Sequence, residues 1–177
     1  MARTKREQDR TEKRDEIVAA ARTLFVDEGY ETASMSRLAT AAGVAPNTIY
    51  WYFQDKDEVL VTVLDAEFTA SMNEYLKLPT TDRAERLLWV TDRLQRVSRL
   101  VSTVHSRVDK SPAINAWHER FHALSEAALR AELQQAGTTP ERIEALVKIS
   151  VFTIEGLLAH PLPDAEKRAI CATLLAC

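Results

Sequence analysis

The string HERFH, which begins at His118, contains the residue types that hydrolytic zinc enzymes use. Two histidines four residues apart share one helix face, and the glutamate between them can accept a proton from zinc-bound water. One function that the sequence offers is therefore that of a metal-sensing regulator or a zinc hydrolase that uses His118, Glu119 and His122. Against it, the pattern is short, and Trp117 and Phe121 belong to the apolar stripe of a helix. We expect no catalytic residue, no metal and no cofactor.

A second stretch offers hydrogen-bonding groups without negative charge. From Thr32 to Gln54 the chain has no aspartate or glutamate, although acidic residues are common elsewhere. Toward its C-terminal end, this stretch offers hydroxyl and amide groups at Asn47, Thr48, Tyr50 and Tyr52. Because no like charge opposes it, this surface can approach a phosphate backbone.

The elements around this stretch have the outline of a helix-turn-helix at about 34–53. Leu38 lies on the inner face of a first short helix, and Gly43 supplies the left-handed residue that ends it. Pro46 suits the first position of a second helix, predicted to run to Phe53. This pair of helices is typical of a device that reads DNA.

The aromatic residues of the second helix divide by helical spacing. Ile49 and Phe53 are one turn apart and are expected in the core. Tyr52 is expected at the surface, and Tyr50 fits either position.

Composition bounds the class of protein. The chain has 177 residues, 46% of them hydrophobic, with only 4 glycines and 6 prolines, which favours an all-α fold. A net charge of -3 argues against coating nucleic acid by bulk electrostatics. Basic charge is local: residues 1–14 carry a net charge of +3. This tail can reach an adjacent groove or phosphates, or be a solvated terminus.

No membrane partner is expected. The N-terminus is too polar for a signal peptide, and no uncharged apolar run approaches the length that a bilayer requires. The protein is therefore expected in the cytoplasm.

The helical pattern divides the chain into two predicted domains. A first helix runs from near Thr11 to Glu28, and another follows an N-cap at Asp55 to about Lys77. Leu78-Pro79-Thr80-Thr81 marks the boundary. The predicted domains are 11–77, a three-helix domain containing the helix-turn-helix, and 80–177, a helical bundle.

The second domain has an excess of apolar surface. Residues 82–108 form one long helix or two in line. The helix at 140–159 is apolar on two sides, with Ile149, Phe152 and small residues on the second side. With a last helix at 164–176 it predicts a symmetric four-helix interface in a homodimer.

Several apolar and imidazole side chains of this domain suit a ligand cavity. Trp89 and Leu100 lie eleven residues apart, nearly on one helical face. The candidate ligand-binding residues are Trp89, Leu100, Trp117, His118, Phe121 and His122. Ordinary core packing explains the same residues.

Residues 11–64 resemble the DNA-binding domain of the tetracycline-repressor (TetR) family. The rest of the chain matches that family only in the layout of its helices. The matching positions are Ile17, Ala20, Ala21, Leu24, Phe25, Gly29, Tyr30, Ser34, Met35, Leu38, Ala39, Ala42, Gly43, Val44, Thr48, Ile49, Tyr50, Phe53, Lys56 and Leu60.

The resemblance implies a homodimeric transcription regulator, usually a repressor, that binds a palindromic operator on double-stranded DNA. It also implies that the protein releases the DNA when a small-molecule effector enters the C-terminal domain. By position, the residues that face base edges are Ser36, Pro46, Asn47 and Thr48. Those that hold phosphates are Tyr50, Tyr52 and Lys56. Trp51 either touches the DNA backbone or packs.

Overall fold

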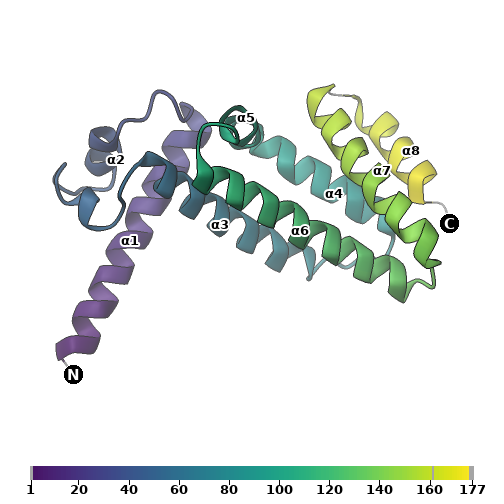
Figure 1. Cartoon of the computed structure of the whole chain (residues 1–177), viewed down its shortest axis with the longest axis horizontal. Coiled ribbons are helices and arrows are strands. Elements are labelled where there is room, and N and C mark those ends of the chain that lie inside the picture. Colours follow the sequence, from purple (N-terminus) through teal and green to yellow (C-terminus); the bar gives the residue numbers. More distant parts are fainter. Residues whose placement is uncertain (1, 161, 176–177) are drawn as a thin grey trace. The chain divides into compact units, whose positions relative to one another are not determined.

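The computed structural model describes residues 2–160 and 162–175, with side chains described from residue 8. The regular secondary structure of these residues is helical and includes no strand, which confirms the all-α prediction (Figure 1). No helix of this described part is long and apolar enough to cross a membrane. The helices are α1 (Ala2–Asp27), α2 (Met35–Ala41), the 3-10 helix η1 (Ile49–Trp51), α3 (Lys56–Tyr75), α4 (Arg83–Arg96), α5 (Ser98–Arg107), α6 (Pro112–Gln135), α7 (Pro140–Ala159) and α8 (Asp164–Leu175).

The helices form two compact units. The first comprises Met1–Thr69 and Arg99–Trp117, and the second comprises Ala70–Ser98 and His118–Cys177. Helices α3 and α6 therefore begin in the first unit and end in the second.

The predicted functional domains, 11–77 and 80–177, divide the chain in another way. Residues 99–117, which include all of α5 except Ser98, pack with the first unit. The two compact units are defined by which residues contact one another and not by what the residues do. The predicted boundary near Leu78, between the DNA-binding and ligand-binding domains, therefore stays a prediction.

The core of the first unit joins α1, α2 and the start of α3. Ile17, Ala21 and Phe25 of α1 are fully buried, as their spacing of three to four residues predicts. Leu38 of α2 and Leu60 of α3 are equally buried. Burying each of the larger side chains contributes roughly 1.5–3 kcal/mol. This core fixes the platform from which the helix-turn-helix region is presented.

The second helix of the predicted helix-turn-helix is the main correction. The sequence predicts an α-helix from Pro46 to Phe53, but the structure has turns there and only the short η1. The physical reason lies in residues 48–52, which are all β-branched or aromatic. Such side chains lose rotamer freedom in an α-helix, and one turn of helix recovers few hydrogen bonds in return.

Two other bounds differ from expectation in a simpler way. Helix α1 begins at Ala2, well before the predicted start near Thr11. The run at 82–108 forms two helices, α4 and α5, separated at Val97, whose φ of -113° and ψ of 29° are not helical. The sequence had left one helix or two as open alternatives.

In the second unit α4, α7 and α8 pack on one another. One core cluster consists of Leu87, Leu88, Leu157, Cys171 and Leu175. Another, formed by α6 and α7, consists of Leu133, Ile143, Leu146 and Val147. Each of the three packed helices therefore buries one apolar face within the unit.

A buried lysine joins α8 to α4 inside this unit. Lys167 is 4% exposed, and its Nζ donates to Asp92 Oδ1 at 2.7 Å and to Gln95 Oε1 at 3.2 Å. It also pairs with Asp164 at 2.9 Å. The hydrogen bonds to Asp92 and Asp164 raise the pKa of Lys167. Because a buried charge needs these partners, the network fixes the rotation of α8 against α4.

Candidate nucleic-acid interface

Helix α2 begins at a capping serine. Ser34 is extended, and its Oγ accepts a hydrogen bond from the backbone N–H of Arg37 at 3.2 Å. Leu38 and Ala39 are fully buried, which leaves Ser36 exposed on the outer side of the helix. The cap and the buried face together set which side of α2 meets solvent.

The turn after α2 depends on a glycine. Gly43 has a φ of +65°, and the N–H of Val44 donates to the carbonyl of Ala39 at 2.9 Å. A Cβ built on Gly43 would meet no atom within 4 Å, so the backbone conformation and not a lack of space favours glycine. The predicted helix stop at Gly43 is confirmed.

A tight turn then presents two aromatic side chains to solvent. The N–H of Trp51 donates to the carbonyl of Thr48 at 3.1 Å, an i→i+3 bond typical of 3-10 geometry. Ile49 and Phe53 are buried, as predicted. Tyr50 is 55% exposed and Trp51 is 74% exposed. Exposing an indole and a phenol beside a buried core leaves them available to a partner surface.

The predicted DNA-contact residues all lie in the first unit, on α2, on the turn after it or at the start of α3. The exposed ones are Ser36, Pro46, Asn47, Tyr50 and Trp51. The half-buried ones are Thr48, Tyr52 and Lys56. Tyr50 is thus placed at the surface, while Tyr52 is less exposed than expected. Contact of these residues with DNA stays a prediction.

Lys56 has a structural task that the sequence did not reveal. Its Nζ donates to the carbonyl oxygen of Tyr30 at 2.9 Å and lies 3.9 Å from the centre of the Tyr30 ring. Burial lowers the pKa of Lys56. An ammonium group has three donors, so this bond fastens the start of α3 to the loop after α1 and still leaves donors for a phosphate.

Sequence reasoning also missed a polar cluster behind the interface. The buried Tyr30 hydroxyl donates to Asp57 in the first turn of α3. Arg107 of α5 donates to the same carboxylate at 3.1 Å and lies over the Tyr30 ring at 4.8 Å. Burial and the hydrogen bond to Asp57 raise the pKa of Tyr30. Burial alone would raise the pKa of Asp57, but hydrogen bonds from Tyr30, Arg107 and Ser111 outweigh it and lower that pKa.

Known proteins with similar sequences are transcription regulators with a helix-turn-helix. Residues 17–63 match the family described as "Bacterial regulatory proteins, tetR family". The chain is 31% identical to the HTH-type transcriptional regulator SrpR of Pseudomonas putida, over 89% of this chain and 79% of SrpR. The chain belongs to the TetR family.

Other TetR-type proteins extend the comparison. The HTH-type transcriptional repressor KstR of Rhodococcus jostii is 26% identical over 84% of this chain and 65% of KstR. A TetR transcription regulator from Haloarcula marismortui shares the fold with a TM-score of 0.77 at 17% identity, over 94% of this chain and 97% of the other. The chain spans less than two thirds of the length of several curated relatives, KstR included.

The predicted ligand-binding residues are distributed over both units. Leu100 and Trp117 belong to the first unit, where both are buried, and Trp117 Nε1 donates to Asp65 Oδ1 at 2.9 Å. The others belong to the second unit: Trp89, His118, Phe121 and His122. There Trp89 packs at a tilt on Tyr75, with ring centres 5.9 Å apart. Their role in ligand binding stays a prediction.

The two histidines of the zinc-like string face each other. The Nε2 atoms of His118 and His122 are 3.1 Å apart, a distance at which one ring nitrogen can donate a hydrogen bond to the other, with the roles set by the tautomers. Within the residues that the structure describes, no group of three or more His, Cys, Asp or Glu is arranged to hold a metal ion. Catalytic zinc ordinarily takes three protein ligands, and TetR-family proteins are transcription regulators rather than enzymes. Nothing favours a metal sensor or a hydrolase.

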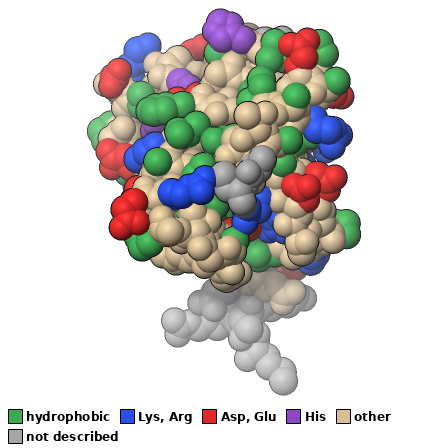
Figure 2. All heavy atoms as spheres, turned by 90° about the vertical axis from the view of Figure 1, so that its right-hand side faces the viewer, with side chains coloured by type: hydrophobic (Ala, Val, Ile, Leu, Met, Phe, Trp, Pro, Cys, Tyr) green, Lys and Arg blue, Asp and Glu red, His purple; other side chains and the backbone are tan. Residues whose placement is uncertain are grey.

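Helix α7 has two apolar faces, as the sequence predicts. Its inner face includes Val147 and Leu157, which are buried, while Ile149 is 48% and Phe152 is 67% exposed on the other side. Ile170 of α8 is 37% exposed. Figure 2 shows hydrophobic side chains at the surface of this unit among charged ones. Apolar side chains exposed at helical spacing on α7 suit an interface with another copy of the chain.

Proposed function

We propose that this protein is a DNA-binding transcription regulator that acts as a ligand-responsive repressor in the cytoplasm. The observation that carries the proposal is the exposed aromatic pair, Tyr50 and Trp51, beside the buried anchors Ile49 and Phe53. This arrangement lies in the segment that matches the TetR family. Aromatic and amide groups presented on a rigid turn suit phosphate and base contacts in a DNA groove.

A symmetric dimer supplies the second half of the proposed DNA site. The outward face of α7 and α8, with Ile149, Phe152 and Ile170, is the proposed interface. The turn at Ile49–Trp51 is here called the reading turn. Because a two-fold dimer presents two copies of it, the operator is a palindrome with two half-sites. That KstR carries the name of a repressor supports repression as the mode of action.

A small molecule is the proposed signal. We propose that it binds among the candidate residues that belong to the second unit, Trp89, His118, Phe121 and His122, and we assign no metal to this site.

The direct test of the reading turn is binding to fluorescently labelled duplex DNA over a series of salt concentrations. Tyr50→Ala should weaken binding by about tenfold, and Tyr50→Phe, which removes only the hydroxyl, should show how much of that loss is the hydrogen bond. Leu76, which is 71% exposed and belongs to the second unit, provides the control variant Leu76→Ala. Wild-type protein that binds no duplex at any salt concentration would refute the proposal.

A further inference from the structure

We propose that Arg10 on α1 forms a second contact with the DNA backbone, beyond the helix-turn-helix. This inference rests on the proposed function and adds a residue that neither the helix-turn-helix nor the start of α3 contains. It concerns the phosphates that flank the bases read by the turn.

The register of α1 points to this residue. Arg10, Arg14, Ile17 and Ala21 follow one another at steps of four, three and four, so they share one face of the helix. In its second half this face is the buried one, since Ile17 and Ala21 are fully buried. In the first half the same face carries Arg10 and Arg14, and the N-terminal end of α1 extends past the rest of the first unit (Figure 1).

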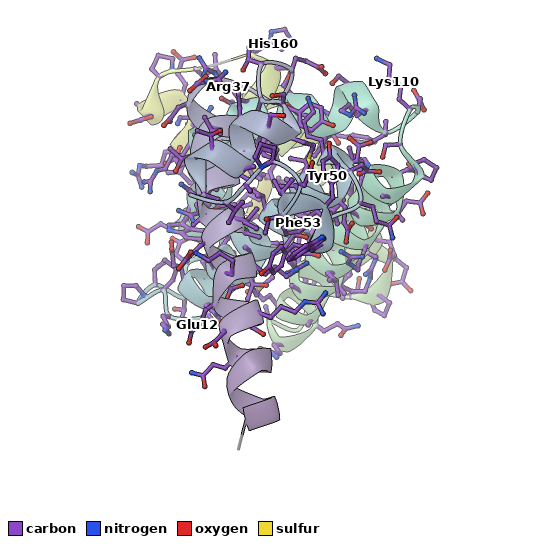
Figure 3. All side chains as sticks on the ribbon, turned by 90° about the vertical axis from the view of Figure 1, so that its left-hand side faces the viewer. Glu12, Arg37, Tyr50, Phe53, Lys110 and His160 are labelled. Carbon is purple, nitrogen blue, oxygen red and sulfur yellow. The ribbon has the colours of Figure 1, made fainter. Side chains whose placement is uncertain are left out.

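Two acidic residues of α1, Glu12 and Asp15, lie on another face than Arg10, whereas Glu7 precedes Arg10 by three residues at helical spacing. Glu12 and Asp15 are exposed and are followed at helical spacing by the exposed Ala19. In Figure 3 Glu12 projects from the side of α1 away from Tyr50. The carboxylates of Glu12 and Asp15 therefore do not oppose a phosphate that approaches Arg10.

A hydrogen bond holds Arg10 beside the reading turn. Its Nη2 donates to the backbone carbonyl of Trp51 at 3.3 Å, and the Trp51 side chain is 74% exposed. A guanidinium has five N–H donors in a rigid planar fork, so one bond to a carbonyl leaves the others for phosphate oxygens. The carbonyl thus orients an exposed cation at the edge of the proposed interface.

The neighbouring basic residues of α1 have other tasks. Arg14 donates to Thr62 Oγ1 at 3.1 Å and lies over the Phe53 ring at 5.0 Å, so it packs α1 on the rest of the unit. Lys13 pairs with Glu16 on its own helix. Among Arg10, Lys13 and Arg14, it is Arg10 that donates a hydrogen bond to the turn carrying the exposed Tyr50 and Trp51.

Fluorescence anisotropy with an operator duplex and a scrambled duplex tests the inference over a series of salt concentrations. Arg10→Gln should weaken binding to both duplexes by a similar factor, about tenfold for each protomer. In a dimer it should lower the slope of log affinity against log salt by about 1.8, because two phosphate contacts are lost. Arg10→Lys, which keeps the charge, should retain most of the slope.

Lys110→Gln removes the same charge from an exposed site of the same unit and is the matched control, expected to leave the slope unchanged. A wild-type slope for Arg10→Gln, on a protein with an unchanged melting temperature, overturns the inference and leaves the proposed function standing. A loss confined to the operator duplex also overturns it, because Arg10 would then act on bases or only on Trp51. Absence of DNA binding by the wild type would instead refute the proposed function itself.

Discussion

At the residue scale, the side chains behind the interface are fastened by partners that are distant in sequence. Tyr30 and Asp57 are 27 residues apart, and Asp57 and Arg107 are 50 apart. Helical periodicity reports which face of a helix is buried, but it carries no information about such pairs. The resemblance to the TetR family implied Lys56 as a phosphate ligand, and no local pattern in the sequence indicated its bond to Tyr30.

Arg107→Ala should destabilise the protein by about 2 kcal/mol, because the half-buried Asp57 carboxylate loses a charged hydrogen-bond partner. The free energy of unfolding in urea measures this. Lys110→Ala, three residues further on at an exposed position, is the control and should stay within about 0.5 kcal/mol of wild type. A similarly small effect for Arg107→Ala would show that the cluster does not stabilise the fold.

The same cluster predicts a dependence of stability on pH. The pKa of Asp57 is lower in the folded state than its ordinary value of 3.8. A lowered carboxyl pKa contributes stability that is present above 3.8 and is lost as the pH falls through the lowered value. The stability difference between wild type and Asp57→Asn should therefore shrink between pH 5 and pH 2, as followed by urea unfolding at each pH. A constant difference would mean that the ionised carboxylate is not the stabilising form.

At the element scale, the sequence predicts helices well where local signals coincide. The helix-ending role of Gly43 was predicted correctly. The inner stripe of α1 predicted from the sequence was Ile17, Ala20, Ala21, Leu24 and Phe25; Ile17, Ala21 and Phe25 are fully buried, while Ala20 and Leu24 are half-buried. The segment from Pro46 to Phe53 was not, because apolar spacing cannot distinguish one α-helical turn from successive 3-10 turns. The exposure of Trp51 follows from that geometry and was left open by the sequence.

Gly43→Ala should destabilise the protein by about 1 kcal/mol, because alanine is strained at a φ of +65°. Thermal or urea unfolding measures the loss. Gly156→Ala is the contrasting variant: Gly156 lies within α7 without a positive φ, and a Cβ there meets no atom within 4 Å. Its effect on the isolated protomer should be neutral or stabilising. Equal destabilisation by both variants would contradict the role assigned to the turn.

At the scale of the whole molecule, the outward face of α7 and α8 predicts the state of assembly. An Ile149→Glu, Phe152→Glu double variant should sediment as a monomer, because two charges would be buried in the proposed interface. Leu124→Glu places the same charge at a side chain of α6 that is 48% exposed, and this control should remain a dimer. If the double variant and the wild type have the same sedimentation coefficient, α7 and α8 do not form the interface.

The central claim is that a dimer of this chain reads a specific palindromic DNA sequence. Selection of bound duplexes from a random-sequence library, followed by sequencing, tests it most directly. The account predicts enrichment of one motif with two inverted half-sites, and a Thr48→Ala variant should change the preferred bases within each half-site. A library that stays random after repeated selection, or that yields only a single asymmetric half-site, would contradict the account.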